Sequence, residues 1–342
     1  MRRIRVLVVE DSLVFRELMV SVLKKDPIID VVAVAADPFD ARDKIIEYQP
    51  DVMTLDIELP RMNGLEFLRK LMPQYPLPVV MVSSLSDKVF DAMQAGAVDF
   101  VVKPAMGDRE QLRKFVEREL PVKIKVASTA KISQIKKTTI TNRTQKVLTS
   151  NRNMVIAIGA STGGTEAIAT VIKEFGTDIP GTVIVQHMPQ GFTEMYAKRL
   201  DDQCRVHVKE AETGDLVVPG QVLIAPGGDS HMRLVKVGNN YQVELKKGSK
   251  VNGHRPSVDV LFESVANVAK ENALGIILTG MGGDGARGLL QMREAGAKTI
   301  GQDESTCVVY GMPKVAYEIG AVQYQERLTN IAKKTYNLLN QM

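Results

Sequence analysis

Ser161 lies in the pentapeptide Gly-Ala-Ser-Thr-Gly at 159–163, which follows the apolar run 155–158 and precedes a segment of good helix formers. A serine at the tip of such a strand-to-helix turn presents its hydroxyl as a nucleophile. The same glycines could instead cradle a phosphate, as in a P-loop, but that motif continues with Lys and Ser/Thr. This chain continues with Thr165 and Glu166, and the negative charge of Glu166 disfavours a phosphate. The turn therefore favours Ser161 as a nucleophile.

A serine needs a base to take its proton, and His187 is the candidate because it ends the next apolar strand. A dinucleotide-binding fold would place an acidic residue at that strand end, so the histidine also disfavours that alternative. Three other histidines compete for the role. His207 lies in an alternating, exposed strand pattern, whereas His231 and His254 lie in loops near strand ends and remain alternatives.

A third group must orient the base, and Asp284 is the candidate carboxylate. It lies in a glycine-rich turn after the apolar strand 275–279 and before a helix. The alternative is that Asp284 only caps that helix. The same turn offers backbone N–H groups, notably that of Met281, which could stabilise an oxyanion. The chain order Ser, His, Asp differs from the order Ser, Asp, His of α/β-hydrolases, so the motif does not predict that fold.

A second group of reactive residues lies at successive strand ends in the first 120 residues. Glu10 and Asp11 end the first strand, Asp56 the third, Ser83 the fourth and Lys103 the fifth. Three converging carboxylates repel one another, and a divalent cation such as Mg²⁺, which prefers oxygen ligands, relieves that repulsion. Asp56 could then accept a phosphoryl group, with Lys103 and Ser83 contacting its oxygens. Taken singly, these residues could be helix caps, turn residues or surface lysines.

The elements that must position these groups alternate between strand and helix. The apolar runs are 6–9, 31–35, 52–55, 79–82 and 100–102, with helical patterns such as 14–25 and 41–48 between them. Five βα repeats predict a flavodoxin-like, doubly wound α/β domain with a parallel sheet, whose ligands bind beyond the carboxyl ends of the strands. At 342 residues, the chain should contain about two domains.

Basic residues gather between the two halves. The segment 121–152 has no Asp or Glu and contains eight of the chain's Lys and Arg residues, so the remainder sums to −4 against an overall charge of +4. Its composition predicts a flexible linker, with contact to an acidic partner as the alternative. The basic residues of the segment are Lys123, Lys125, Lys131, Lys136, Lys137, Arg143, Lys146 and Arg152.

The remaining composition excludes several classes of protein. Cys204 and Cys307 lie far apart without a CxxC motif, which disfavours a disulfide framework or a zinc site and favours a reducing cytoplasm. No apolar segment approaches the roughly 20 residues needed to cross a membrane. The chain has no Trp and 5% aromatic residues, so stacking on nucleobases is disfavoured. We therefore expect a cytoplasmic protein that neither inserts into a membrane nor binds nucleic acid.

The first 120 residues resemble the receiver domains of response regulators. The resemblance rests on VLVVEDS, LDIELPRMNG, VVMVSS and DFVVKP, in that order. It implies that Asp56 is phosphorylated by a histidine kinase and that Glu10, Asp11 and Asp56 bind Mg²⁺. It also implies that Phe100 is the aromatic side chain whose position reports the switch.

Residues 153–342 resemble the catalytic domain of the chemotaxis protein-glutamate methylesterases, the CheB family. The matching motifs are GASTGGTEAI, VIVQHMP, APGGDSHM, NGHRPSVDVLF, TGMGGDGARG and GQDESTCVVYGMP. The resemblance implies a doubly wound, mostly parallel α/β domain with an antiparallel hairpin. It also implies that Ser161, His187 and Asp284 form a catalytic triad, and that Thr162, Thr165 and Met281 line the same site.

Together the two resemblances imply a phosphorylation-activated hydrolase that demethylates glutamate γ-methyl esters on chemoreceptors. Some members of the family also deamidate glutamines by the same attack. Two other functions stay open: a non-catalytic response regulator whose second domain binds nucleic acid or a nucleotide, and an esterase that acts on small substrates without control by its first domain.

Overall fold

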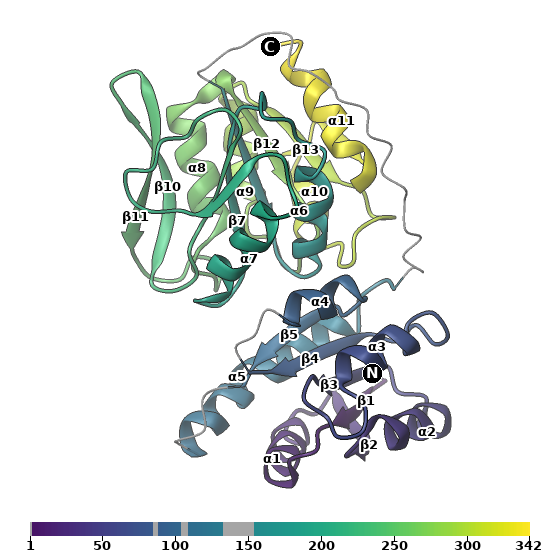
Figure 1. The fold of residues 1–342 in the computed structure, drawn as a ribbon. Helices are drawn as coiled ribbons and strands as arrows, with labels where there is room; N and C mark the ends of the chain where they lie inside the picture. Colours follow the sequence, from purple (N-terminus) through teal and green to yellow (C-terminus); the bar gives the residue numbers. More distant parts are fainter. Residues whose placement is uncertain (1, 85–87, 104–108, 133–153) are drawn as a thin grey trace. The chain divides into compact units, whose positions relative to one another are not determined.

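The computed structural model describes residues 2–84, 88–103, 109–132 and 154–342. The chain divides into two compact units, Met1–Thr138 and Thr139–Met342, each with its own parallel sheet and flanking helices (Figure 1). Among the described residues, no helix has the length and apolar character that crossing a membrane requires.

The five predicted strands of the first unit form one parallel sheet in the order β2-β1-β3-β4-β5, which confirms the flavodoxin-like arrangement. Helices α1 and α5 pack together, as do α3 and α4. The elements are β1 (Ile4–Val9), α1 (Leu13–Leu23), β2 (Ile29–Ala35), α2 (Pro38–Tyr48), β3 (Val52–Asp56), α3 (Gly64–Leu71), β4 (Val79–Ser83), α4 (Lys88–Gln94), β5 (Asp99–Val102) and α5 (Arg109–Ala127).

Helix α5 corrects the predicted start of the linker, because it continues through 121–127. Leu120, Ile124 and Ala127 are buried at the spacing of one helix face, and this burial carries the helix past Pro121. The helix that ends the first unit therefore extends past residue 120, the boundary predicted from the sequence. The rest of the predicted linker from residue 133 lies outside the described residues.

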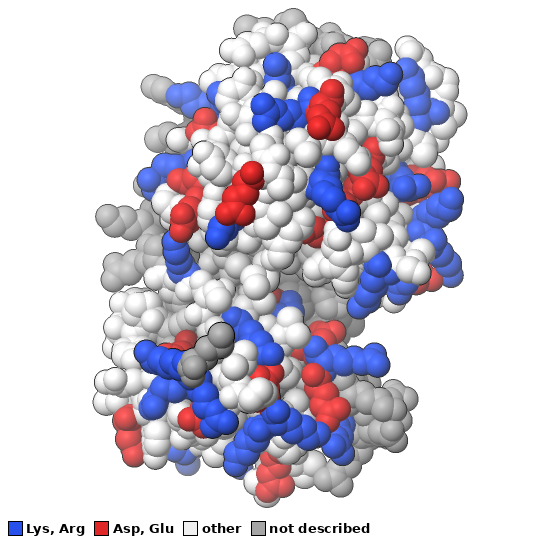
Figure 2. Space-filling view, turned by 180° about the vertical axis from the view of Figure 1, so that it is seen from behind, with Lys and Arg blue, Asp and Glu red and all other residues white. Residues whose placement is uncertain are grey.

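Two lysines that we assigned to the basic linker are paired within the first unit. Lys123 lies 2.7 Å from Asp99, and Lys125 lies 2.6 Å from Asp26. Acidic and basic side chains are interspersed on the face of the molecule seen in Figure 2. Part of the positive charge of 121–152 thus pairs with carboxylates of the first unit instead of projecting from a tether.

The second unit contains a seven-stranded parallel sheet in the order β14-β13-β12-β6-β7-β9-β8, and a separate antiparallel hairpin formed by β10 and β11. The expected mostly parallel α/β domain with a hairpin is confirmed. The elements that position the site are β6 (Val155–Ala160), α6 (Gly164–Ile172), β7 (Gly181–Gln186), α8 (Val258–Val268), β12 (Ala273–Ile277) and α9 (Ala286–Glu294).

The other elements complete the layers around that sheet. Helix α8 packs against α9 and against the hairpin, whereas α6 packs against α11. These elements are α7 (Phe192–Asp201), β8 (His207–Glu210), β9 (Gln221–Ile224), β10 (Ser230–Val237), β11 (Asn240–Lys247), β13 (Lys298–Gln302), α10 (Met312–Glu318), β14 (Tyr324–Glu326) and α11 (Leu328–Leu339), with a 3₁₀ turn at Lys270–Asn272.

Candidate active site

Ser161 and His187 directly follow two neighbouring strands, β6 and β7, at the carboxyl edge of the second sheet. The last paired residues of β6 and β7 are Ala160 and Gln186, and the His187 N–H donates to the Ala160 carbonyl at 3.1 Å. The Gln186 side-chain amide then donates to the Ser161 carbonyl at 2.9 Å and to the His187 carbonyl at 3.2 Å. This amide fixes the two chain segments relative to each other just beyond the sheet.

The turn that carries Ser161 is held from both sides. Its N–H donates to the Thr279 carbonyl at 3.0 Å, and its carbonyl accepts from the Gly164 N–H at 2.7 Å. Gly163 has a φ of +76°, which only glycine adopts without strain. Helix α6 begins directly afterwards, so the predicted strand, turn and helix around Ser161 are confirmed.

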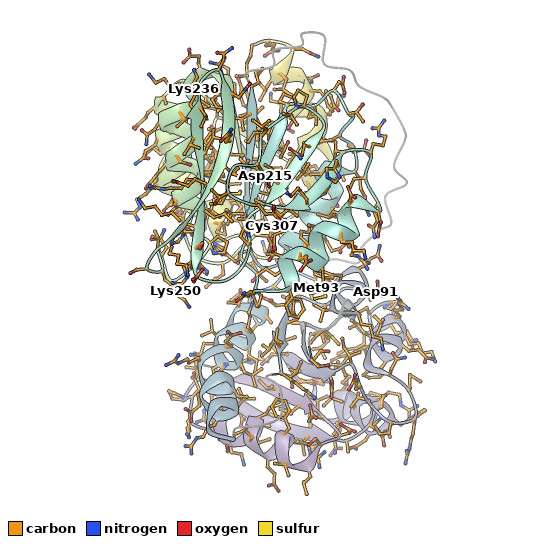
Figure 3. The ribbon with its side chains drawn as sticks, turned by 60° about the vertical axis from the view of Figure 1, so that its left-hand side comes forward. Asp91, Met93, Asp215, Lys236, Lys250 and Cys307 are labelled. Atoms are coloured by element: carbon orange, nitrogen blue, oxygen red, sulfur yellow. The ribbon has the colours of Figure 1, made fainter. Side chains whose placement is uncertain are left out.

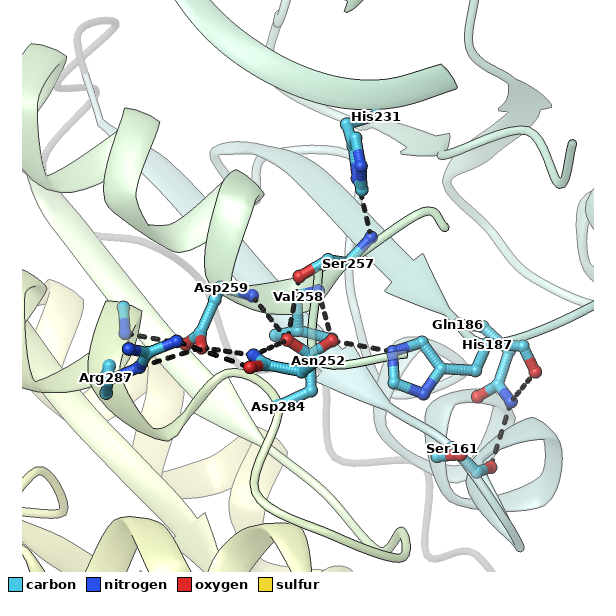
Figure 4. Close-up of polar contacts among 11 residues, drawn as sticks. Ser161, Gln186, His187, His231, Asn252, Ser257, Val258, Asp259, Asp284 and Arg287 are labelled. Carbon is cyan, nitrogen blue, oxygen red and sulfur yellow. Dashed lines mark hydrogen bonds and ion pairs between the residues drawn. The ribbon is translucent and has the colours of Figure 1, made fainter. Parts of the chain in front are cut away.

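His187 and Asp284 meet, as the sequence predicts. His187 Nε2 lies 2.8 Å from Asp284 Oδ2, and their side chains are only 8% and 1% exposed. The other ring nitrogen, Nδ1, is buried and has no hydrogen-bond partner within the described residues. In Figure 4, His187 lies between Asp284 and Ser161. Both residues are described, and no direct hydrogen bond joins the Ser161 hydroxyl to the ring; such bonds often form only once substrate is bound.

The Asp284 carboxylate lies at the N-terminus of α8, which is not the helix that follows it in the chain. It accepts hydrogen bonds from the Val258 N–H at 2.7 Å, the Asp259 N–H at 3.3 Å and the Ser257 hydroxyl at 2.7 Å (Figure 4). Asp284 therefore caps α8, whereas the alternative from the sequence was that it caps the helix that directly follows it. The positive end of the α8 dipole favours the ionised carboxylate.

These partners keep Asp284 ionised despite its burial. Burial alone would raise the pKa of the carboxyl group, but the hydrogen bond and charge of His187, together with the donors Asn252 and Ser257, hold that pKa well below its ordinary value. At neutral pH the carboxylate is anionic. Because a carboxylate only accepts hydrogen bonds, Nε2 is the ring nitrogen that donates to Asp284, and Nδ1 is the other ring nitrogen of His187.

The remaining histidines have different environments. His207 is exposed at 61% and pairs with Asp201, away from this network. His231 is buried, donates toward the Ser249 carbonyl at 2.8 Å and accepts from the Ser257 N–H, so its two nitrogens hold loops together. His254 stacks on His187, with ring centroids 3.7 Å apart. The printed sequence thus offers four histidines, and the hydrogen bond to Asp284 described above is made by His187.

The three residues expected to line the site lie around Ser161. Thr162 and Thr165 are buried, and the Thr165 hydroxyl has no hydrogen-bond partner within the described residues. Met281 is 46% exposed and follows Gly280, whose backbone approaches Ser161 closely enough that a Cβ atom there would lie 2.7 Å from the serine Cβ. Met281 therefore directly follows the residue at which this turn comes close to Ser161.

Sequence reasoning missed three polar residues of this site. Gln186, Asn252 and Ser257 make direct hydrogen bonds to the segments or side chains of the predicted triad. The Asn-Gly pair at 252–253 is a turn signal that could have marked that loop. No pattern, however, shows that this loop folds back onto Asp284.

The predicted acidic site of the first unit is also assembled. One carboxylate oxygen from each of Glu10, Asp11 and Asp56 lies within 4.8 Å of the others, a set of oxygen donors that fits a hard cation such as Mg²⁺. Lys103 Nζ lies 2.8 Å from Glu10 Oε2 and 2.5 Å from Asp56 Oδ2. Burial raises the pKa of Glu10 to about 7 although Lys103 acts in the opposite direction, and burial likewise raises the pKa of Asp56.

Two further residues of the expected switch lie in β4 and β5. Ser83 is buried at the end of β4, and its carbonyl accepts the Lys103 N–H at 2.6 Å. Phe100 is buried in β5. Strand β4 lies directly beside β3, which carries Asp56, and β5 lies on the other side of β4.

Comparisons with known proteins show which families the two units match. Residues 156–335 match the family model for the CheB methylesterase, and residues 6–117 match that for the response regulator receiver domain. The chain belongs to the CheB methylesterase family. It is 59% identical to a protein-glutamate methylesterase/protein-glutamine glutaminase of Syntrophomonas wolfei, over 100% of this chain and 99% of that protein.

Other members of the family are also similar to this chain in sequence or in structure. A protein of the same name from Salmonella typhi is 48% identical over 98% of this chain and 96% of its own. The catalytic domain of the Thermotoga maritima CheB methylesterase superposes with a TM-score of 0.53 at 40% identity, covering 54% of this chain and 98% of that chain. The receiver and the α/β catalytic unit are thus the two parts of a CheB family protein.

Proposed function

We propose that this protein is a phosphorylation-activated hydrolase that demethylates glutamate γ-methyl esters on chemoreceptors in the cytoplasm. The observation that carries the proposal is the buried His187–Asp284 hydrogen bond of 2.8 Å beside the Ser161 turn. That arrangement supplies a nucleophile, a base and an orienting anion at one sheet edge. The relatives, which are named protein-glutamate methylesterases, indicate the substrate class.

The first half-reaction transfers the acyl group to Ser161. His187 Nδ1 takes the hydroxyl proton while the serine oxygen attacks the ester carbonyl, and Asp284 stabilises the imidazolium that forms. Collapse of the tetrahedral intermediate breaks the bond to the methoxy oxygen, which leaves as methanol with the proton from His187. The product is an ester between Ser161 and the glutamate γ-carboxyl group.

The second half-reaction returns the enzyme to its starting state. Water gives a proton to His187 and attacks the acyl-enzyme, and the serine oxygen leaves with that proton, which yields free glutamate. With a glutamine side chain the same sequence releases ammonia in place of methanol. The names of the relatives, which include protein-glutamine glutaminase, favour this second substrate.

The oxyanion would be stabilised by the turn after β12. The Gly280 N–H donates to the Val309 carbonyl at 3.1 Å, and the Gly280 carbonyl accepts from Gly311 and Met312. Within the described residues the next N–H, that of Met281, has no partner, so it is available to the intermediate. Thr162 and Thr165 complete the lining around the serine.

Control would come from the receiver. A histidine kinase would phosphorylate Asp56, with Ser83 and Lys103 contacting the added oxygens and Phe100 reporting the switch. Glu10, Asp11 and Asp56 would hold Mg²⁺, which neutralises negative charge at the phosphorylation site. Phosphorylation changes activity only if the phosphoryl group favours one receiver conformation over the other.

Methanol release from methylated receptor membranes tests the catalytic proposal. Ser161→Ala should abolish release, because the nucleophile is lost, whereas wild type and a His207→Ala control should be equally active. Equal rates for wild type and Ser161→Ala would refute the triad.

A phosphodonor tests the regulatory proposal. Wild type should release methanol faster after phosphodonor is added, and Asp56→Asn should not respond. A response from Asp56→Asn would refute phosphorylation of this residue, and an unchanged wild-type rate would favour the esterase without receiver control.

A further inference from the structure

A tight turn beside the candidate active site has two side chains that the mechanism above does not use. Val251 and His254 exchange backbone hydrogen bonds of 3.0 and 2.9 Å, which closes the turn. Asn252 and Gly253 form its tip, with φ values of +52° and +83°. The turn follows the β10–β11 hairpin, just beyond Lys250, at the opposite end of the hairpin from Lys236 (Figure 3).

Asn252 separates two buried carboxylates. Its Nδ2 lies 2.9 Å from Asp284 Oδ1 and 2.7 Å from Asp259 Oδ2, so both amide hydrogens are directed at acidic groups (Figure 4). Both carboxyl side chains are 1% exposed. Arg287 approaches Asn252 Oδ1 at 3.3 Å and Asp259 at 3.7 Å. The amide thus fixes the Asp284 oxygen that does not contact His187.

His254 constrains the plane of the His187 ring. The two imidazoles are stacked, with centroids 3.7 Å apart and planes 6° from parallel. The hydrogen bond to Asp284 fixes only one ring atom, and the ring can still swing about its Cβ–Cγ bond. A flat ring in van der Waals contact with one face restricts that swing.

We propose that Asn252 and His254 are positioning residues that act together through this one turn, Asn252 on the carboxylate and His254 on the imidazole. The inference rests on the proposed function, because it concerns the geometry in which His187 receives the Ser161 proton. Neither residue is assigned a contact with substrate. Their effect is to hold two members of the triad in the arrangement needed for the transition state.

Replacing His254 by Phe and by Leu separates stacking from simple space filling. Both side chains fill the site, but only Phe presents a flat ring. For methanol release from receptor membranes, we expect His254→Phe to keep kcat within roughly threefold of wild type. His254→Leu should lose kcat roughly 10–100-fold, with KM changed less than about twofold, because ring orientation matters to the chemical step and not to binding.

Replacing Asn252 tests the other half of the turn. Asn252→Gly keeps the positive φ and removes the amide, and we expect kcat to fall about tenfold. Asn252→Asp places a third carboxylate between two others, so we expect a larger fall. Labelling of Ser161 by a fluorophosphonate should follow the same order as kcat, and melting temperatures compare the stability of the variants. His207→Phe and His207→Leu are the matched controls and should behave as wild type.

The outcomes separate this inference from the proposed function. If Ser161→Ala keeps wild-type methanol release, the proposed function fails and the inference fails with it. If Ser161→Ala is inactive but His254→Leu keeps the wild-type kcat, the inference alone is overturned. Equal losses in His254→Phe and His254→Leu would also overturn it, because they would assign the effect to a ring nitrogen of His254.

Discussion

Gly280 sets how closely the turn after β12 approaches Ser161, and Gly280→Ala should therefore impair the chemistry more than the fold. A Cβ atom at this position would lie 2.7 Å from the Ser161 Cβ and 2.4 Å from the Met312 sulfur. Ordinary contact begins near 3.4 Å, so the serine must move by roughly 0.7 Å unless the whole turn shifts. A displacement of about 1 Å costs about 10²-fold in rate, and we expect kcat for methanol release to fall roughly 10–100-fold.

The expected loss of folding stability in Gly280→Ala is too small to explain the expected fall in kcat. Insertion of a methyl group into a packed site costs about 1–3 kcal/mol, or a decrease in melting temperature of roughly 2–12 °C for a unit of this size. The catalytic unit should remain folded at 25 °C. Circular dichroism and thermal melts measured on the same preparation check that the kinetic loss is not a loss of folded protein.

Gly283→Ala is the matched control, because it adds the same methyl group to the same turn. The three atoms nearest to its Cβ would all belong to the Val315 side chain, the closest at 3.1 Å. We expect kcat within about twofold of wild type. Two outcomes would contradict the reasoning: full activity in Gly280→Ala, or equal losses in the two variants.

The other predictions concern charge. Asp284→Asn should lower kcat by about 10²–10⁴-fold, because the amide no longer stabilises the imidazolium. Since the folded-state pKa of Asp284 lies well below its ordinary value, the carboxylate stabilises the fold above about pH 4 and loses this effect as pH falls. The difference in unfolding free energy between wild type and Asp284→Asn should therefore shrink between pH 5 and 2 in urea titrations. Glu10 has the opposite effect on stability, because burial raises its pKa to about 7. As pH rises from about 4.5 to 7, the free energy of unfolding should fall by on the order of 1–3 kcal/mol, since Glu10 ionises more readily in the unfolded chain. Glu10→Gln should gain stability over wild type across that range, and constant relative stability would contradict this. Mg²⁺ should raise the receiver's melting temperature more at pH 8 than at pH 5; Glu10→Gln should reduce the gain.

The sequence identified the parts of the site that lie at strand ends. Parallel strands bring their carboxyl ends to one sheet edge, so Ser161, His187 and Asp284 could be placed together from three apolar runs and the residues that follow them. The same rule placed Glu10 and Asp56 together in the receiver. In both units the hydrophobic pattern carried the prediction.

The residues that the sequence did not identify come from packing between elements. Asn252 and Ser257 lie in a loop with no periodicity, and they reach Asp284 only because α8 directs its N-terminus at the turn after β12. The extent of α5 was misjudged for a related reason. The basic composition of 121–152 indicates a linker, but burial of Ile124 and Ala127 in α5 outweighs it.

The capping of Asp284 by α8 bears on how this family can vary in sequence. Two of the donors are main-chain amides, at Val258 and Asp259, which no ordinary side-chain replacement removes. Proline is the exception, since it lacks the N–H. The surroundings of the carboxylate can therefore be inherited through the path of the backbone while side chains diverge, provided that the helix still starts at the same place. Val258 itself has less freedom, because it fills the space over Gly159 and Gly285.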